Sequence, residues 1–174
     1  MFIVSNHLQT VKFPIRSTHI VRINIAWIKD KEELTQIITG VRGHKVLLDF
    51  PSGRFKPPQS ELTLEEVMEV AKKFIYVKYL AWSNVEEKSQ LIELRNKIDG
   101  LKVTLVPKIE TLKGVENLAS ICEGITKIAM LDKEDLYLNL EKNNDLYNMA
   151  VEQVRKTASE HKINLLELVG VIFA

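Results

Sequence analysis

The residues of this chain with the clearest chemical potential lie between positions 102 and 138. Two short apolar runs, at 103–106 and 125–131, are each followed by charged side chains. Lys108 and Glu110 follow the first run, and the acidic stretch 132–135 follows the second. Side chains two residues apart on a strand point to the same face, so Lys108 and Glu110 should lie together. A lysine beside a carboxylate suits a site that holds an anion and a divalent cation.

This spacing leaves two interpretations open. Glu110 and Asp135 could supply hard oxygen ligands to one Mg²⁺ or Mn²⁺ from neighbouring strands, because carboxyl ends of parallel strands share one edge. On spacing alone, a solvated charged loop after each strand is the more common arrangement. An ion pair in such a loop contributes little to stability.

The rest of the chain predicts the scaffold for these residues. Apolar runs with strand character alternate with helical patterns, which is typical of a parallel sheet in an α/β fold. Capping residues at Asp30, Thr63, Ser83 and Asn143 or Asn144 predict helix starts. We expect seven strands, at 2–4, 20–27, 45–50, 75–82, 103–106, 125–131 and 168–173. Complete eight-unit barrels need roughly 200 residues or more, so 174 residues predict an incomplete TIM-like (β/α) barrel forming one domain, 1–174.

The composition of the chain argues against nucleic-acid-binding, disulfide-bonded and membrane-spanning proteins. Lys and Arg number 24 against 23 acidic residues, for a formal charge of +1, which gives no electrostatic case for nucleic acid. Cys122 is the single cysteine, so an intrachain disulfide is excluded. We find no apolar run of the roughly 18 residues that a membrane span needs, and no signal-peptide pattern. We therefore expect a cytoplasmic protein without a membrane partner.

Two segments resemble a known group of barrel enzymes. PKIETLKGVENLASI and ITKIAMLDKEDL are similar to the "KIE…GVEN" and "RGDLG" segments of pyruvate kinase. They also resemble the metal-site segments of the citrate lyase β-subunit and HpcH/HpaI aldolase family, which shares a phosphoenolpyruvate/pyruvate-binding barrel. Three further stretches are similar to pyruvate kinase segments in the same order, namely 21–42, KVLLDFPSGRF and 78–98. The resemblance covers roughly residues 20–173.

The resemblance implies roles for individual residues. Glu110 and Asp135 correspond to the family's metal ligands, and Lys108 to the lysine that acts on the transferring phosphoryl group or the enolate. Arg22 matches a phosphate-contacting arginine. The family's potassium-site residues correspond to Asn24 and Asp49, and the arginine of "RGDLG" corresponds to Lys133.

The chain also departs from the family pattern. Both glycines of "RGDLG" are replaced, by Glu134 and Tyr137, and the potassium-site serine is Ala26. The segment 51–61 is too short for the lid domain of pyruvate kinase. Phosphoryl transfer depends on positioning and on exclusion of water, so we expect no appreciable phosphorylation of ADP from phosphoenolpyruvate in a coupled assay.

Two functions remain open at this stage. The first is metal-dependent binding or turnover of a pyruvate-like 2-oxo acid or phosphoenolpyruvate, with carbon–carbon lyase-type enolate chemistry. The second is a non-catalytic relative that serves as a partner-binding or regulatory module, and the lost glycines favour it. A missing eighth unit should leave the strands at 2–4 and 168–173 as edges. We expect a homodimer contact or the segment 6–17 to cover them.

Overall fold

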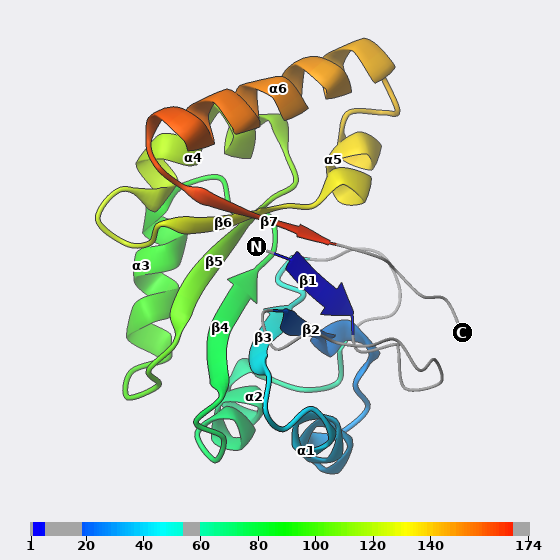
Figure 1. Cartoon of the computed structure of the whole chain (residues 1–174), viewed down its shortest axis with the longest axis vertical. Coiled ribbons are helices and arrows are strands. Elements are labelled where there is room, and N and C mark those ends of the chain that lie inside the picture. Colours follow the sequence, from blue (N-terminus) through cyan, green and yellow to red (C-terminus); the bar gives the residue numbers. More distant parts are fainter. Residues whose placement is uncertain (1, 6–18, 54–59, 169–174) are drawn as a thin grey trace. The chain divides into compact units, whose positions relative to one another are not determined.

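The structure is a computed structural model that describes residues 2–5, 19–53 and 60–168 (Figure 1). The segment 6–17, expected to cover an edge, and positions 169–173 of the expected last strand lie outside the described residues. The chain divides into two compact units. The first comprises 1–80, 98–104 and 168–174, and the second comprises 81–97 and 105–167.

The first unit holds parallel strands with two helices packed against each other. Its strands are β1 (Phe2–Ser5), β2 (Ile20–Asn24), β3 (Lys45–Phe50) and the larger part of β4 (Val77–Trp82). The pairs β1–β2 and β2–β3 are both parallel, and Asn24 is level with Asp49 in the second pair. Helices α1 (Lys31–Gly40) and α2 (Leu64–Ala71) contribute Leu34, Ile38 and Val67 to the core.

The second unit carries the candidate chemistry. Its elements are α3 (Lys88–Lys97), β5 (Thr104–Ile109), α4 (Leu112–Cys122), β6 (Ile128–Leu131), α5 (Lys133–Asn139), α6 (Asn144–Glu160) and β7 (Asn164–Leu168). The pairs β5–β6 and β6–β7 are parallel. Helix α4 packs against both α3 and α6, and α6 also contacts α5 (Figure 1). All strand pairs whose register is described are therefore parallel, as the alternating pattern predicts.

Several helices begin where their capping residues predict. The Asp30 side chain accepts from the Glu33 N–H, and Asn143 caps α6 through the Leu146 N–H. Thr63 and Glu66 form a complete capping box at the start of α2. Each cap satisfies backbone donors that have no partner within the helix. Local sequence therefore determines these three starts.

Other predicted boundaries are wrong. Strand β2 ends at Asn24, because the Asn24 side chain accepts from the Ala26 N–H and turns 25–27 into a short 3-10 helix. Strand β4 begins at Val77, and Ile75 is 86% exposed. Strand β7 begins at Asn164, earlier than the expected position 168.

The elements on either side of the central helix also differ from the prediction. Strand β5 extends to Ile109, so Lys108 lies within it. Strand β6 begins only at Ile128, after the turn through Gly124, whose φ is +71°. The stretch 132–135, predicted as a loop, contains the start of α5. These shifts place Lys108 on a strand and Asp135 on a helix, while Glu110 directly follows the strand.

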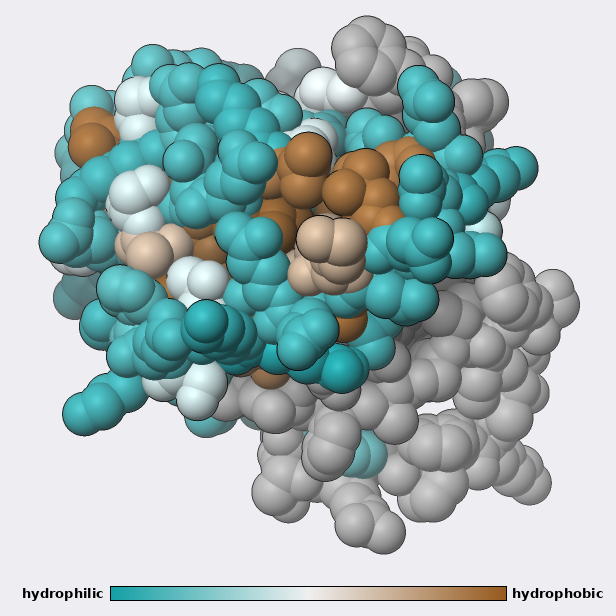
Figure 2. Space-filling view, turned by 90° about the horizontal axis from the view of Figure 1, so that it is seen from above, coloured by the Kyte–Doolittle hydropathy of each residue, from teal (hydrophilic) through white to brown (hydrophobic). Residues whose placement is uncertain are grey.

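On the face drawn in Figure 2, the described residues are mostly polar. Figure 2 shows one face on which hydrophilic residues surround a small group of hydrophobic ones. Within the described parts of the chain, none of the helices combines the length and apolarity that crossing a membrane would require.

Candidate metal centre

The ends of strands β5 and β6 bring three carboxylates together in the second unit. Lys108 is level with Met130 and Ile109 with Leu131 in the parallel register. The residue that directly follows each of these two strands is acidic, namely Glu110 after β5 and Asp132 after β6. Asp135 follows one turn into α5. One carboxylate oxygen from each of these three residues lies within 4.8 Å of the other two.

Each of the two carboxylate oxygens of Glu110 has a polar contact that holds the side chain in place. Its side chain is 2% exposed. Oε2 accepts a 2.6 Å hydrogen bond from the backbone N–H of Asn84, and Oε1 lies 2.7 Å from Lys108 Nζ. Apart from this ion pair, Oε1 has no hydrogen-bond partner among the described residues. The carboxylate is therefore fixed in direction, with one buried oxygen turned toward the acidic cluster.

Lys108 places a positive charge inside the same cluster. Its side chain is 4% exposed, and Nζ lies 3.2 Å from Asp132 Oδ2 as well as 2.7 Å from Glu110 Oε1. Nζ also donates to Ser83 Oγ at 3.3 Å. Burial of an ammonium group is costly unless it is paired and hydrogen-bonded. The two carboxylates and the hydroxyl meet that requirement.

Asp132 has two roles in the structure. One side-chain oxygen accepts a 3.4 Å hydrogen bond from the Asp135 N–H and so caps α5, while the other approaches Lys108. A carboxylate at a helix start interacts favourably with the helix dipole. The cap also fixes the first turn of α5, which carries Asp135.

The loop 83–87 supports the site from the side of β4. Asn84 adopts φ of +53°, a left-handed conformation that asparagine tolerates better than most residues. The Gln90 side chain accepts from the N–H groups of Glu86 and Glu87 and donates to the Asn84 carbonyl. The prediction that a helix starts at Ser83 is therefore wrong. These residues form a fixed loop that aims the Asn84 N–H at Glu110, and α3 begins only at Lys88.

Electrostatics at Glu110 reflect its burial. Burial raises the pKa of Glu110 above its ordinary value, and the charge of Asp132 adds to that rise. The Lys108 ammonium and the Asn84 N–H act in the opposite direction but do not cancel it. Repulsion from a neighbouring carboxylate is thus a smaller cause of the raised pKa than desolvation.

The donor set fits a hard divalent cation. Carboxylate oxygens are the ligands that Mg²⁺ and Mn²⁺ prefer, and the cluster offers one from each of Glu110, Asp132 and Asp135. Oε1 of Glu110 is buried and already faces a positive charge, the Lys108 ammonium at 2.7 Å, and it makes no further hydrogen bond among the described residues. These three residues could hold such an ion.

The predicted site residues fall into two groups. Lys108, Glu110 and Asp135 meet in the second unit, while Lys133 lies exposed on the first turn of α5. Arg22, Asn24 and Asp49 belong to the first unit.

In the first unit, Arg22 and Asp49 form a buried ion pair. The guanidinium donates to Asp49 Oδ2 through Nε at 2.7 Å and also through Nη2. The side-chain oxygen of Asn24 caps the short turn after β2. Both contacts hold parts of the fold together. The ligand roles predicted for Arg22, Asn24 and Asp49 stay predictions.

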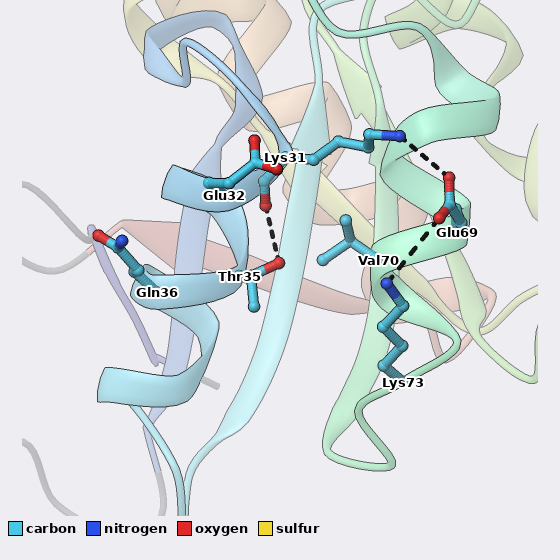
Figure 3. A pocket seen from close by; sticks show the side chains of 7 residues that line it. All are labelled: Lys31, Glu32, Thr35, Gln36, Glu69, Val70 and Lys73. Atoms are coloured by element: carbon cyan, nitrogen blue, oxygen red, sulfur yellow. Dashed lines mark hydrogen bonds and ion pairs between the residues drawn. The ribbon is translucent and has the colours of Figure 1, made fainter.

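A surface groove of about 410 Å³ lies between α1 and α2 of the first unit (Figure 3). Glu69 at its edge is already paired with Lys31 at 3.2 Å and with Lys73 at 3.8 Å. Figure 3 shows Val70 pointing into the space between the two helices. Because its charged side chains are exposed and neutralise each other, the groove does not have the features of a binding site.

Sequence reasoning missed three participants in the cluster. Asp132 was missed because it meets Glu110 only through the register in which β6 pairs with β5. Asn84 contributes a backbone group, which its residue type does not reveal. Ser83 was assigned to a helix start and instead accepts from Lys108.

Comparisons with known proteins support the fold class. The sequence matches no protein-family model and no curated protein. The structure is similar to that of macrophomate synthase, with a TM-score of 0.66 and 13% identity over 84% of this chain and 62% of the other. It is also similar to an HpcH/HpaI aldolase from Desulfitobacterium hafniense DCB-2, with a TM-score of 0.64 and 10% identity over 99% and 78%. An HpcH/HpaI aldolase/citrate lyase family protein from Burkholderia cenocepacia J2315 gives a TM-score of 0.66 and 9% identity over 95% and 79%.

These likenesses confirm an α/β fold of the incomplete TIM-like barrel type. The chain spans less than two thirds of macrophomate synthase. The neighbours named here are aldolase, lyase and synthase proteins, and the narrower likeness to pyruvate kinase rests on the sequence segments alone.

Proposed function

We propose that this chain binds a divalent cation, Mg²⁺ or Mn²⁺, and with it a pyruvate-like 2-oxo acid, on which it performs lyase-type enolate chemistry. The observation that carries the proposal is the cluster of Glu110, Asp132 and Asp135 beside the buried Lys108 ammonium. The aldolase and lyase proteins among the structural neighbours support the same reaction class. Carbon–carbon lysis also needs no lid domain of the kind that phosphoryl transfer uses.

Each residue has a defined part in this proposal. Glu110, Asp132 and Asp135 would hold the cation, which supplies Lewis-acid stabilisation of negative charge on the substrate oxygen when bound. The Asn84 N–H keeps the Glu110 carboxylate in a fixed direction. Lys108 contributes a buried positive charge in a water-poor environment, where charge stabilisation is strongest.

Calorimetric titration with Mg²⁺ and Mn²⁺, alone and with pyruvate, oxaloacetate or phosphoenolpyruvate, tests the proposal. We expect binding of the cation, and tighter binding of a 2-oxo acid in its presence. Glu110→Gln and Asp135→Asn should each abolish the metal signal. Glu116→Gln makes the same chemical change at an exposed position on α4 and should leave the signal intact. Metal binding that survives both Glu110→Gln and Asp135→Asn would contradict the proposed site.

One observation favours a second candidate function. Lys108 already neutralises part of the acidic cluster, with both partners of its 2.7 Å ion pair almost fully buried. A cluster stabilised in this way could persist in a non-catalytic relative that binds a partner or regulates another protein. Absence of any heat of binding with either metal, together with full folding, would favour this second candidate.

A further inference from the structure

The acidic cluster of the second unit already contains one cation, the ammonium group of Lys108. It lies 2.7 Å from Glu110 Oε1 and 3.2 Å from Asp132 Oδ2, and these are two of the three residues that could hold a metal. The Lys108 side chain is 4% exposed, so water does little to screen its charge. The cluster therefore binds positive charge in the metal-free protein.

The ammonium and a metal ion would compete for the same atom. Oε1 of Glu110 is the oxygen that Lys108 contacts, and Oε2 is engaged by the Asn84 N–H. A divalent ion that used Oε1 would stand next to the ammonium. Two such charges next to one buried oxygen repel each other strongly, because a protein interior screens charge much less than water does.

We propose that Lys108 is an internal counter-ion that a divalent cation must displace from Glu110, so that the native lysine weakens metal binding. This inference rests on the proposed metal site and deepens it. Ser83 Oγ, 3.3 Å from Nζ, gives the displaced ammonium a partner that is not a metal ligand. The lysine thus stays buried in the site and remains available to a bound anion.

Titration calorimetry with Mg²⁺ on single variants of the full chain tests the proposal. Lys108→Met keeps the length of the side chain and removes its charge. Lys113→Met is the matched control, because Lys113 also pairs with acidic residues of this unit, Glu86 and Glu87, but is 51% exposed and lies outside the cluster. We expect Lys108→Met to bind Mg²⁺ at least about tenfold more tightly than the unmodified protein. Lys113→Met should stay within about twofold.

Other results would overturn the proposal. Equal or weaker Mg²⁺ binding by Lys108→Met would show that the lysine does not compete with the metal. If neither the unmodified protein nor Lys108→Met binds Mg²⁺, the cation site does not exist and the proposal is wrong. If Lys108→Met does not fold, as circular dichroism would show, Lys108→Gln replaces it, because the amide keeps a donor for Glu110 and Ser83. The same tightening is expected, and its absence has the same meaning.

A measurement on the unmodified protein gives a further test. The side-chain nitrogen resonance of Lys108 should shift when Mg²⁺ is added, while that of Lys113 should not. An unchanged Lys108 resonance at saturating Mg²⁺ would overturn displacement. None of these experiments needs a substrate, so the counter-ion role can fail while 2-oxo acid chemistry stands. Conversely, the counter-ion role can hold in a protein that turns nothing over.

Discussion

Gly114→Ala should destabilise the protein, although alanine is the better helix former. Gly114 lies in the first turn of α4, where replacing glycine by alanine ordinarily gains up to about 1 kcal/mol. Here a Cβ at position 114 would lie 2.8 Å from the carbonyl oxygen of Val85. That oxygen belongs to the backbone and cannot rotate away. Overpacking of this kind costs typically about 1–3 kcal/mol, so we expect a net loss of about 1–2 kcal/mol.

The same clash should reach the metal centre. The Val85 N–H donates to the Lys108 carbonyl, and the N–H of the preceding Asn84 donates to Glu110 Oε2 at 2.6 Å. A displaced loop would therefore loosen the carboxylate that we propose as a metal ligand. We expect Gly114→Ala to weaken Mg²⁺ binding in calorimetry as well as lowering stability.

Gly40→Ala provides the control for this prediction. Gly40 is the last residue of α1, and a Cβ there would meet nothing within 4 Å. It should be neutral or stabilising by up to about 1 kcal/mol. Urea unfolding followed by circular dichroism compares the two variants, with about 2–4 °C of Tm per kcal/mol as a second measure. If Gly114→Ala is as stable as Gly40→Ala, the close approach of α4 to the loop is refuted.

Three further predictions concern pH, the thiol and a helix cap. The pKa of Glu110 is raised in the folded protein above its ordinary 4.5, so the folded state binds that proton more tightly than the unfolded state. The metal-free protein should therefore lose stability as pH rises from 4.5 through the raised pKa, and Glu110→Gln should flatten that part of the urea-unfolding profile. Burial raises the pKa of Cys122 to about 12, so a disulfide reagent at pH 8 should react with it only when urea unfolds the protein, and rapid labelling of the native form would contradict this. Thr63→Ala removes the capping box of α2 and should cost about 0.5–2 kcal/mol in the same urea assay, while an unchanged midpoint would show that the cap is dispensable.

The sequence predicted those features that depend on local pattern. The alternation of apolar runs indicated parallel strands, and Asp30, Thr63 and Asn143 marked helix starts because each side chain satisfies a nearby backbone donor. The two-residue period of a strand predicted that Lys108 and Glu110 lie on one face. In the structure the two side chains form an ion pair.

Other features of the site depend on contacts between distant segments. Asp132 meets Glu110 because β6 pairs with β5 in one particular register, which no local pattern specifies. The Asn84 N–H reaches Glu110 because side chains of α3 and α4 hold the loop 83–87. The raised pKa of Glu110 likewise comes mainly from burial, and burial is a property of the packed fold.

Solvent deuterium exchange into the methyl group of pyruvate tests the central claim most directly, because exchange requires formation of the enolate. With Mg²⁺ or Mn²⁺ present, the protein should accelerate exchange by about 100-fold or more over the metal in buffer alone. Glu110→Gln should abolish the acceleration, and Glu116→Gln should retain it. Exchange no faster than with the free metal, or acceleration that survives Glu110→Gln, would contradict metal-assisted enolate chemistry at this centre.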